Sequence, residues 1–207
     1  MSFFTVIRFT LKAAGIALAF ATLVALSGCW VTSINPLYEE TTFENLSKDP
    51  DIVFESSLIG SWAPSGDKCT TPLVIASKDK EIYVLKRKGE GEGCTGSDKV
   101  QMEARLVKLD SHYFLDVFPL PNDVCDMCLG KHNIFLMKID KATLSLTPID
   151  SDWLRKALAA RTITLPTLAG DTDTITASSQ DLKAFCRKYA ADVEVFKPDP
   201  SSTLTRK

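Results

Sequence analysis

A series of short segments in which apolar and polar residues alternate constrains the fold of this chain more than any other feature. In "KVQMEARLVKL", residues 99–109, every second residue from 100 to 106 is apolar and the residues between them are polar. A period of two places the apolar side chains on one face of a β-strand, whereas a helix would scatter them around its circumference. The segment "HYFLDVF", residues 112–118, is apolar on both faces, so we expect a central strand that is covered on both sides.

Further strand-like segments lie close together along the chain. They are "PLVIAS" (72–77), "EIYVLKRKG" (81–89), "NIFLMKID" (133–140), "ATLSLTPI" (142–149) and, with weaker patterns, "RTITLP" (161–166) and "TDTITAS" (172–178). The segments 133–140 and 142–149 predict a hairpin about Asp140 and Lys141. The short spacing indicates antiparallel order, because parallel neighbours need long crossover connections.

Two amphipathic segments predict helices near 151–161 and 179–190. The first, "SDWLRKALAAR", begins at Ser151, which we expect to be its N-cap. The second follows Ser178, which forms an S-x-x-D capping pattern with Asp181, and its apolar residues at i, i+3, i+4 and i+7 from Leu182 fall on one face. Cys186 belongs to that face, so we expect it to be a buried free thiol that packs as a small apolar residue.

The first residues of the chain have the pattern of an export signal. Arg8 and Lys12 give the start a positive charge, and an almost entirely apolar run extends from Ala13 to Leu26. This run is shorter than the ~20 residues that a helix needs to span a bilayer. Residues 1–28 are therefore expected to be a signal peptide.

The apolar run ends in "LSGC", residues 26–29, which resembles the lipobox of bacterial lipoproteins. The resemblance implies that Cys29 carries a diacylglyceryl group, that the chain is cut before it, and that the lipoprotein maturation and sorting machinery are partners. Two or three acyl chains make anchoring effectively permanent. Trp30 stands at the position where aspartate would retain a Gram-negative lipoprotein at the inner membrane, so we expect a cell-envelope protein anchored to the outer membrane.

Residues 29–57 follow as the acylated cysteine and a tether, in which Pro36 and Pro50 disfavour a helix. Two alternatives remain open for this segment. It is either a tether that packs partly on the domain, or an arm that lies along the sheet. The side chains expected to pack are Ile34, Leu37, Tyr38 and Phe54. Residues 58–207 are expected to form a single antiparallel, β-rich domain.

Charge excludes one class of partner. The chain has 24 basic residues, two of them in 1–28, against 26 acidic residues. The mature protein is therefore mildly acidic and has no electrostatic footprint for nucleic acid or for anionic lipid. The acyl chains on Cys29 must then provide the membrane attachment.

Gly60-Ser61-Trp62 resembles the G-x-W of the first strand in lipocalins and their calycin relatives. The resemblance implies a barrel whose closed end is plugged by Trp62 and whose open end takes an apolar ligand. We expect Trp62, Phe114 and Phe118 to lie near or beneath the concave face and to bind such a ligand. Trp62 is otherwise a large core residue at the start of a strand. We therefore predict a mainly β (α+β) fold, a curved antiparallel sheet or a partial lipocalin-like barrel, with two packed helices.

More of the chain resembles a group of uncharacterised bacterial lipoproteins. The shared features are Cys29, "TSINPLY", "LIGSW", "ARLVKLDSHYFLDVFP", "DSDWL" and the helix before "VEVF". This resemblance implies an architecture and no activity.

The cysteines leave several alternatives open. Cys125, Cys128 and His132, in "CDMCLGKH", have the spacing of three zinc ligands, of a redox dithiol, or of a local disulfide in a structural loop. Cys69 and Cys94 lie in separate loops that a second disulfide could join. An odd number of cysteines follows Cys29, so one is left unpaired, binds metal or links two chains.

The sequence contains no G-x-S-x-G, H-E-x-x-H or P-loop. We therefore expect a non-catalytic binding or scaffold module, for an apolar ligand or an envelope protein, with no cofactor. The alternative is a zinc or thiol-redox protein centred on Cys125, Cys128 and His132.

Overall fold

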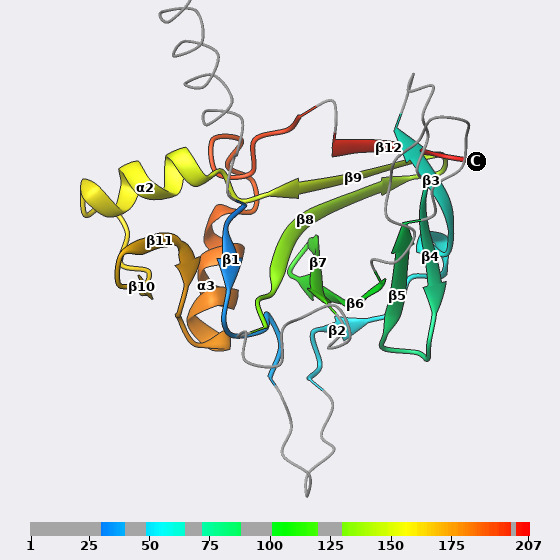
Figure 1. Cartoon of the computed structure of the whole chain (residues 1–207), viewed down its shortest axis with the longest axis horizontal. Helices are drawn as coiled ribbons and strands as arrows, with labels where there is room; N and C mark the ends of the chain where they lie inside the picture. The colour runs from blue at the N-terminus through cyan, green and yellow to red at the C-terminus, as the bar shows by residue number, and fades with distance from the viewer. Residues whose placement is uncertain (1–29, 40–48, 65–71, 88–100, 120–129, 200–201) are drawn as a thin grey trace, which may run out of the picture.

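The protein is a closed, eight-stranded antiparallel β-barrel with two helices and a small second sheet on one side (Figure 1). The computed structural model describes residues 30–39, 49–64, 72–87, 101–119, 130–199 and 202–207. The barrel strands are β3 (Gly60–Pro64), β4 (Leu73–Ser77), β5 (Tyr83–Arg87), β6 (Gln101–Leu109), β7 (His112–Pro119), β8 (Asn133–Asp140), β9 (Thr143–Pro148) and β12 (Thr203–Arg206). The mainly β class with two helices is confirmed.

Each strand from β3 to β9 pairs with the next one along the chain, and β12 then pairs with both β9 and β3. In this register, Leu204 lies opposite Leu144 on one side and Pro64 on the other. The sheet is therefore closed rather than partial. Its closure depends on the C-terminal "TLTR", which the sequence analysis did not identify as a strand.

The strand predictions for residues 72–149 are confirmed within a few residues. The β8–β9 hairpin pairs Asp140 with Thr143, and Lys141 in its turn has a φ of 27°. The prediction for residues 161–166 is wrong, because no strand forms there. The strands nearest to it are β10 (Thr167–Leu168) and β11 (Asp171–Ile175), which pair with each other outside the barrel.

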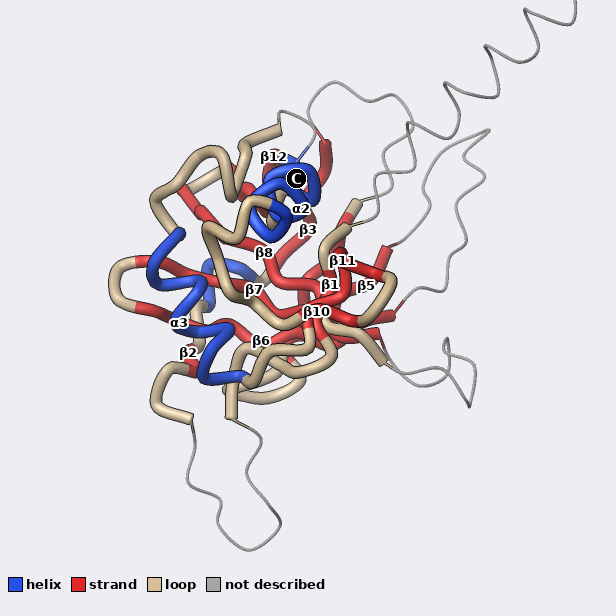
Figure 2. The backbone as a smooth tube through the Cα atoms, turned by 90° about the vertical axis from the view of Figure 1, so that its left-hand side faces the viewer, coloured by secondary structure: helices blue, strands red, loops and turns tan. Residues whose placement is uncertain are grey.

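The chain leaves the barrel between β9 and β12 and forms both helices, α2 (Ser151–Ala159) and α3 (Ser179–Tyr189). Figure 2 shows them in front of the strands, on the side that also carries β10 and β11. Ser178 caps α3 as expected, since its hydroxyl accepts a hydrogen bond from Asp181 N at 3.1 Å. The N-cap of α2 is Asp150, not Ser151, because the Asp150 carboxylate accepts from Trp153 N at 2.7 Å.

The segment expected to be a tether or an arm lies along the body of the protein in its described parts. Its strand β1 (Thr32–Ser33) pairs in parallel with β11, and β2 (Ile52–Val53) pairs with β6. A short 3-10 turn, η1 (Ser56–Leu58), precedes β3. Leu37 and Tyr38 are buried, Ile34 is half-buried and Phe54 is exposed. In its described parts, residues 30–39 and 49–57, the segment therefore packs on the domain.

Alternation along β6, β7 and β8 divides the core into two clusters. Leu106, Leu115 and Phe135 point into the barrel, while their neighbours Val107 and Phe114 point outward. The outer cluster includes apolar residues of α2 and α3, and Cys186 lies within it as a buried free thiol, as expected. Burial raises the pKa of the Cys186 thiol. The β7 strand is thus covered on both faces, as predicted.

No helix in the described part of the chain is both long enough and apolar enough to cross a membrane.

Candidate functional site

The barrel contains a cavity of about 570 Å³, within the range of ligand-binding pockets. Its apolar lining includes Trp62, Leu85, Met102, Val117, Phe135 and Leu204. Each of these side chains alternates along its strand with one that points outward, so the interior of a small barrel can be apolar without exposing that surface to water. The cavity is larger than the polar pocket of about 190 Å³ described below.

The cavity lies toward one end of the barrel. Pro64 and Pro148 end their strands there, and Leu73 and Asn133 begin theirs. Polar lining comes from this end and from the segment before β12, through Asp150, Lys197, Asp199 and Ser202. The polar groups surround an apolar interior, which is the usual arrangement of a small-molecule site.

Trp30 also lines this cavity, although it belongs to no barrel strand. Its side chain is 58% exposed, and its ring packs edge-on against Phe135 with the centroids 5.5 Å apart. Val31 directly after it is buried. Cys29, the residue before Trp30 in the sequence, lies outside the described residues.

Trp62 is fully buried and lines the cavity, as the sequence analysis expected. Its indole Nε1 donates to Leu58 O at 2.8 Å, and the Arg206 guanidinium lies 4.3 Å from its ring centroid. Arg206 also donates to the carbonyl oxygens of Ser57 and Ile59. The last strand therefore closes over the tryptophan through a cation–π contact and hydrogen bonds.

Gly60 leaves room for this contact. Its φ is +151°, and a Cβ placed on it would lie 2.7 Å from Nη1 of Arg206. A side chain there would push the guanidinium off the Trp62 ring. The spacing of glycine and tryptophan in "GSW" thus has a structural reason in this chain.

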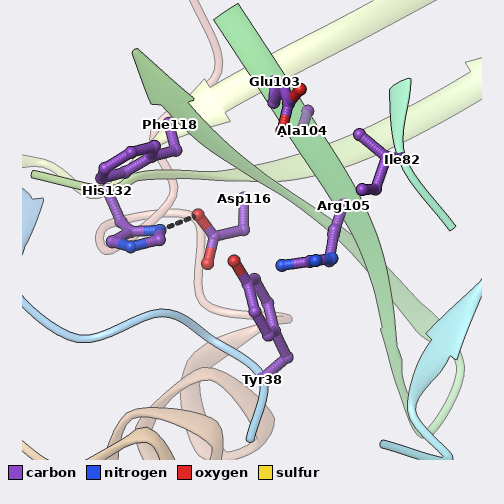
Figure 3. Close-up of a pocket in the computed structure, with 8 residues that line it drawn as sticks. All are labelled: Tyr38, Ile82, Glu103, Ala104, Arg105, Asp116, Phe118 and His132. Carbon is purple, nitrogen blue, oxygen red and sulfur yellow. Dashed lines mark hydrogen bonds and ion pairs between the residues drawn. The ribbon is translucent and has the colours of Figure 1, made fainter. Parts of the chain in front are cut away.

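A second, polar pocket of about 190 Å³ lies on the outer face of the same barrel wall (Figure 3). Arg105 pairs with Asp116 across β6 and β7, and Glu103 pairs with Phe118, so all four side chains share the outward-facing side. Tyr38, from the N-terminal arm, and His132, just before β8, complete the pocket.

Asp116 organises this polar pocket. Its Oδ1 lies 2.7 Å from Nδ1 of His132, and its Oδ2 accepts from Leu37 N at 2.7 Å. An ionised carboxylate only accepts, so Nδ1 of His132 donates and Nε2 is the nitrogen available to a ligand. Both side chains are buried. The pair therefore joins the arm to the barrel wall and fixes the orientation of the imidazole.

Arg105 lies on the other side of the pocket. Its guanidinium carbon is 4.4 Å from the ring centroid of Tyr38, and its buried Nε makes no hydrogen bond to the described residues. Glu103 is engaged elsewhere, by Lys78 Nζ at 2.6 Å. In Figure 3 the guanidinium of Arg105 points toward the Tyr38 hydroxyl and the Asp116 carboxylate.

The three residues predicted to line a ligand site are not brought together. Trp62 lines the barrel cavity, but Phe114 is fully buried in the outer cluster, 5.7 Å from Phe196 between ring centroids. Phe118 also points outward and stacks at 4.7 Å on the ring of His132. The predictions for Phe114 and Phe118 are wrong about the face, because the inward positions of β7 are Leu115 and Val117.

The cysteine predictions fall on Cys69, Cys94, Cys125 and Cys128, which all lie outside the described residues. His132 is described, and it forms the pair with Asp116. Within the described ranges, no three His, Cys, Asp or Glu side chains are grouped as metal ligands.

The sequence analysis missed the roles of Asp116, Arg105 and Trp30. A signal for Asp116 was present, because it is the one acidic residue in the apolar segment "HYFLDVF". A carboxylate there must be buried and therefore needs hydrogen-bond partners. No local pattern indicated that Trp30 would contact the barrel.

Comparison of the chain with models of known families, with curated proteins and with solved structures gives no match.

Proposed function

We propose that this chain is a lipid-anchored protein of the bacterial cell envelope whose barrel binds an apolar ligand. The observation that carries the proposal is the cavity of about 570 Å³ inside the barrel, with its mainly apolar lining. Burying apolar ligand surface in such a cavity is favourable by about 25 cal/mol per Å². The protein holds or carries its ligand and performs no reaction on it.

The anchor is part of the proposal. The thiol of Cys29 takes a diacylglyceryl group, residues 1–28 are then removed, and Trp30 at the next position favours the outer membrane. The attachment supports an apolar ligand of membrane origin, because Trp30 is both the neighbour of the acylated residue and part of the cavity lining.

The test uses the Cys29→Ser domain, purified from the periplasm. Mass spectrometry under native and then denaturing conditions would reveal a non-covalent adduct of lipid size, and titration with the fluorescent probe N-phenyl-1-naphthylamine would measure affinity. Absence of both an adduct and probe binding would refute the ligand proposal and leave a scaffold role. Intact mass of the wild-type protein would show whether Cys29 carries acyl groups.

A matched pair of variants locates the site. Leu146 lines the cavity and is half-buried, so Leu146→Trp should fill part of it and weaken probe binding at least tenfold, or about 1.4 kcal/mol. Leu168, which lies on β10 outside the barrel, is 43% exposed. Leu168→Trp should leave probe binding unchanged. Equal effects of the two substitutions would place the probe outside the cavity.

A second candidate function is zinc binding by Cys125, Cys128 and His132. The arrangement of His132 favours it, because metal-ligating histidines usually donate their other ring N–H to a carboxylate, as Nδ1 does here to Asp116. The native mass would then carry one zinc ion that a chelator removes and that His132→Gln weakens.

If alkylation without reductant instead shows Cys125 and Cys128 blocked as a disulfide, the zinc candidate fails. A redox role for the pair would require that ordinary thiol pools reduce this disulfide. The same mapping would show whether Cys69 and Cys94 are joined.

A further inference from the structure

The position of Trp30 constrains how the barrel sits on a membrane. In the proposed mature protein Trp30 is the second residue, and only one peptide bond separates it from the acylated Cys29. Val31 is 3% exposed, and β1 begins at Thr32, so the chain is packed onto the domain immediately after Trp30. The described structure thus leaves almost no length for a spacer between the acyl chains and the barrel.

The same end of the molecule has the most exposed large apolar side chains of the described residues, Val193 at 62% and Trp30 at 58%. Trp30 lines the cavity beside Pro148 and Lys197. Val193 lies close to this end, because Val195 O accepts from the N–H of Asp150, another lining residue, at 2.8 Å. In Figure 1, β1 lies beside β8, whose Phe135 is the partner of the Trp30 ring.

We infer that the side of the cavity formed by the ends of β8, β9 and β12 rests on the phospholipid bilayer, with the Trp30 ring in its interface. The inference rests on the proposed function, since it needs the acyl chains on Cys29. An amphipathic indole is well suited to the boundary between headgroups and acyl chains. The cavity then opens toward the membrane, and its ligand is a phospholipid acyl chain that enters without crossing water.

Fluorescence quenching by brominated lipid tests this arrangement. The acylated full-length protein is reconstituted in vesicles of phosphatidylethanolamine and phosphatidylglycerol, with and without phosphatidylcholine that is brominated on its acyl chains. Trp153 is partly buried in the outer cluster and should not contact the bromines, whereas Trp62 lines the cavity and contacts them only where a brominated acyl chain has entered it. We expect brominated lipid to quench the Trp30 contribution, and Trp30→Phe to abolish that contribution. Quenching that remains in Trp30→Phe then comes from Trp62 and reports an acyl chain inside the cavity.

The matched control places the tryptophan at position 168 in place of position 30. Leu168→Trp in the Trp30→Phe background places an exposed tryptophan on β10, in the small side sheet, and should not be quenched. Equal quenching at positions 30 and 168, or none at position 30, would overturn the inferred orientation.

The two proposals fail in different ways. Probe binding by the soluble Cys29→Ser domain without quenching of Trp30 would overturn the orientation alone. Quenching of Trp30 without probe binding would retain the orientation and refute the ligand. Loss of the wild-type protein from the vesicles would refute the lipid anchor, and the orientation with it.

Discussion

The inner and outer faces of strands β6 to β8 line two pockets of opposite character. On the inner face, Leu106, Leu115 and Phe135 form part of an apolar cluster beside a cavity. One residue away, on the outer face, Arg105 and Asp116 line a polar pocket. On the two faces of the same strands, the stability of the fold therefore depends on different interactions. The inner face tolerates empty space, whereas this part of the outer face, beside the apolar cluster, depends on the pairing of buried polar groups.

The largest effect is expected on the outer face. Asp116→Ala leaves Leu37 N and His132 Nδ1 without their acceptor in a buried site, and should lower the free energy of unfolding by about 3 kcal/mol. Urea denaturation measures this loss. The exposed Asp140, on β8, supplies the control, because Asp140→Ala should change stability by less than about 0.5 kcal/mol. Similar effects of the two substitutions would show that the Asp116 pair has no structural role.

The second-largest effect on stability is expected where the arm contacts α3, and this effect depends on pH. Lys183, on α3, donates to Asp49 and Asp51 at 2.7 Å each, and ties the arm to the helical layer. Burial pushes the pKa of Asp49 upward, but hydrogen bonds from Lys183 and from two backbone N–H groups hold it below the ordinary 3.8. A depressed carboxyl pKa stabilises the fold above pH 3.8, and this contribution is lost as the pH falls further.

Asp49→Asn should therefore cost about 2 kcal/mol at pH 7 and progressively less as the pH falls below 3.8. Urea unfolding at pH 7 and at pH 3 would show this. A cost that is the same at both pH values would mean that the carboxylate charge does not carry the effect.

The smallest effect on stability is expected on the inner face, at the residue next to Asp116. Val117→Ala removes two methyl groups from the wall of an existing cavity and should cost about 1.5 kcal/mol. It should also change the affinity for N-phenyl-1-naphthylamine, whereas Asp49→Asn should lower stability without such a change. If Val117→Ala left the affinity for the probe unchanged and Asp49→Asn altered it, the assignment of probe binding to the inner face would be wrong.

The sequence predicted the fold well where each segment carries its own pattern. Strands with a period of two and the helix capped by Ser178 appear as expected, because their signals are local. The face of β7 could not be predicted, since "HYFLDVF" is apolar on both sides and offers no alternation that would indicate which residues point inward. Phe114 and Phe118 were assigned to the wrong side for that reason.

Closure of the barrel could not be predicted from local sequence patterns either. The segment "TLTR" of β12 is short and half-polar, and it becomes a strand because β3 and β9 provide partners on both sides. The candidate sites likewise depend on contacts between separate segments of the chain. Trp30, Tyr38, Asp116 and His132 are far apart in sequence, and only the packing of the arm on the barrel brings them to the two pockets.

The closing strand sets an order of events during folding. Arg206, the penultimate residue, makes the contact with Trp62 that ties the two ends of the sheet together. Until β12 has been synthesised and has paired, β3 and β9 are open edges of an incomplete sheet, and such edges invite pairing with other chains. The sheet therefore stays unfinished until this four-residue strand completes it.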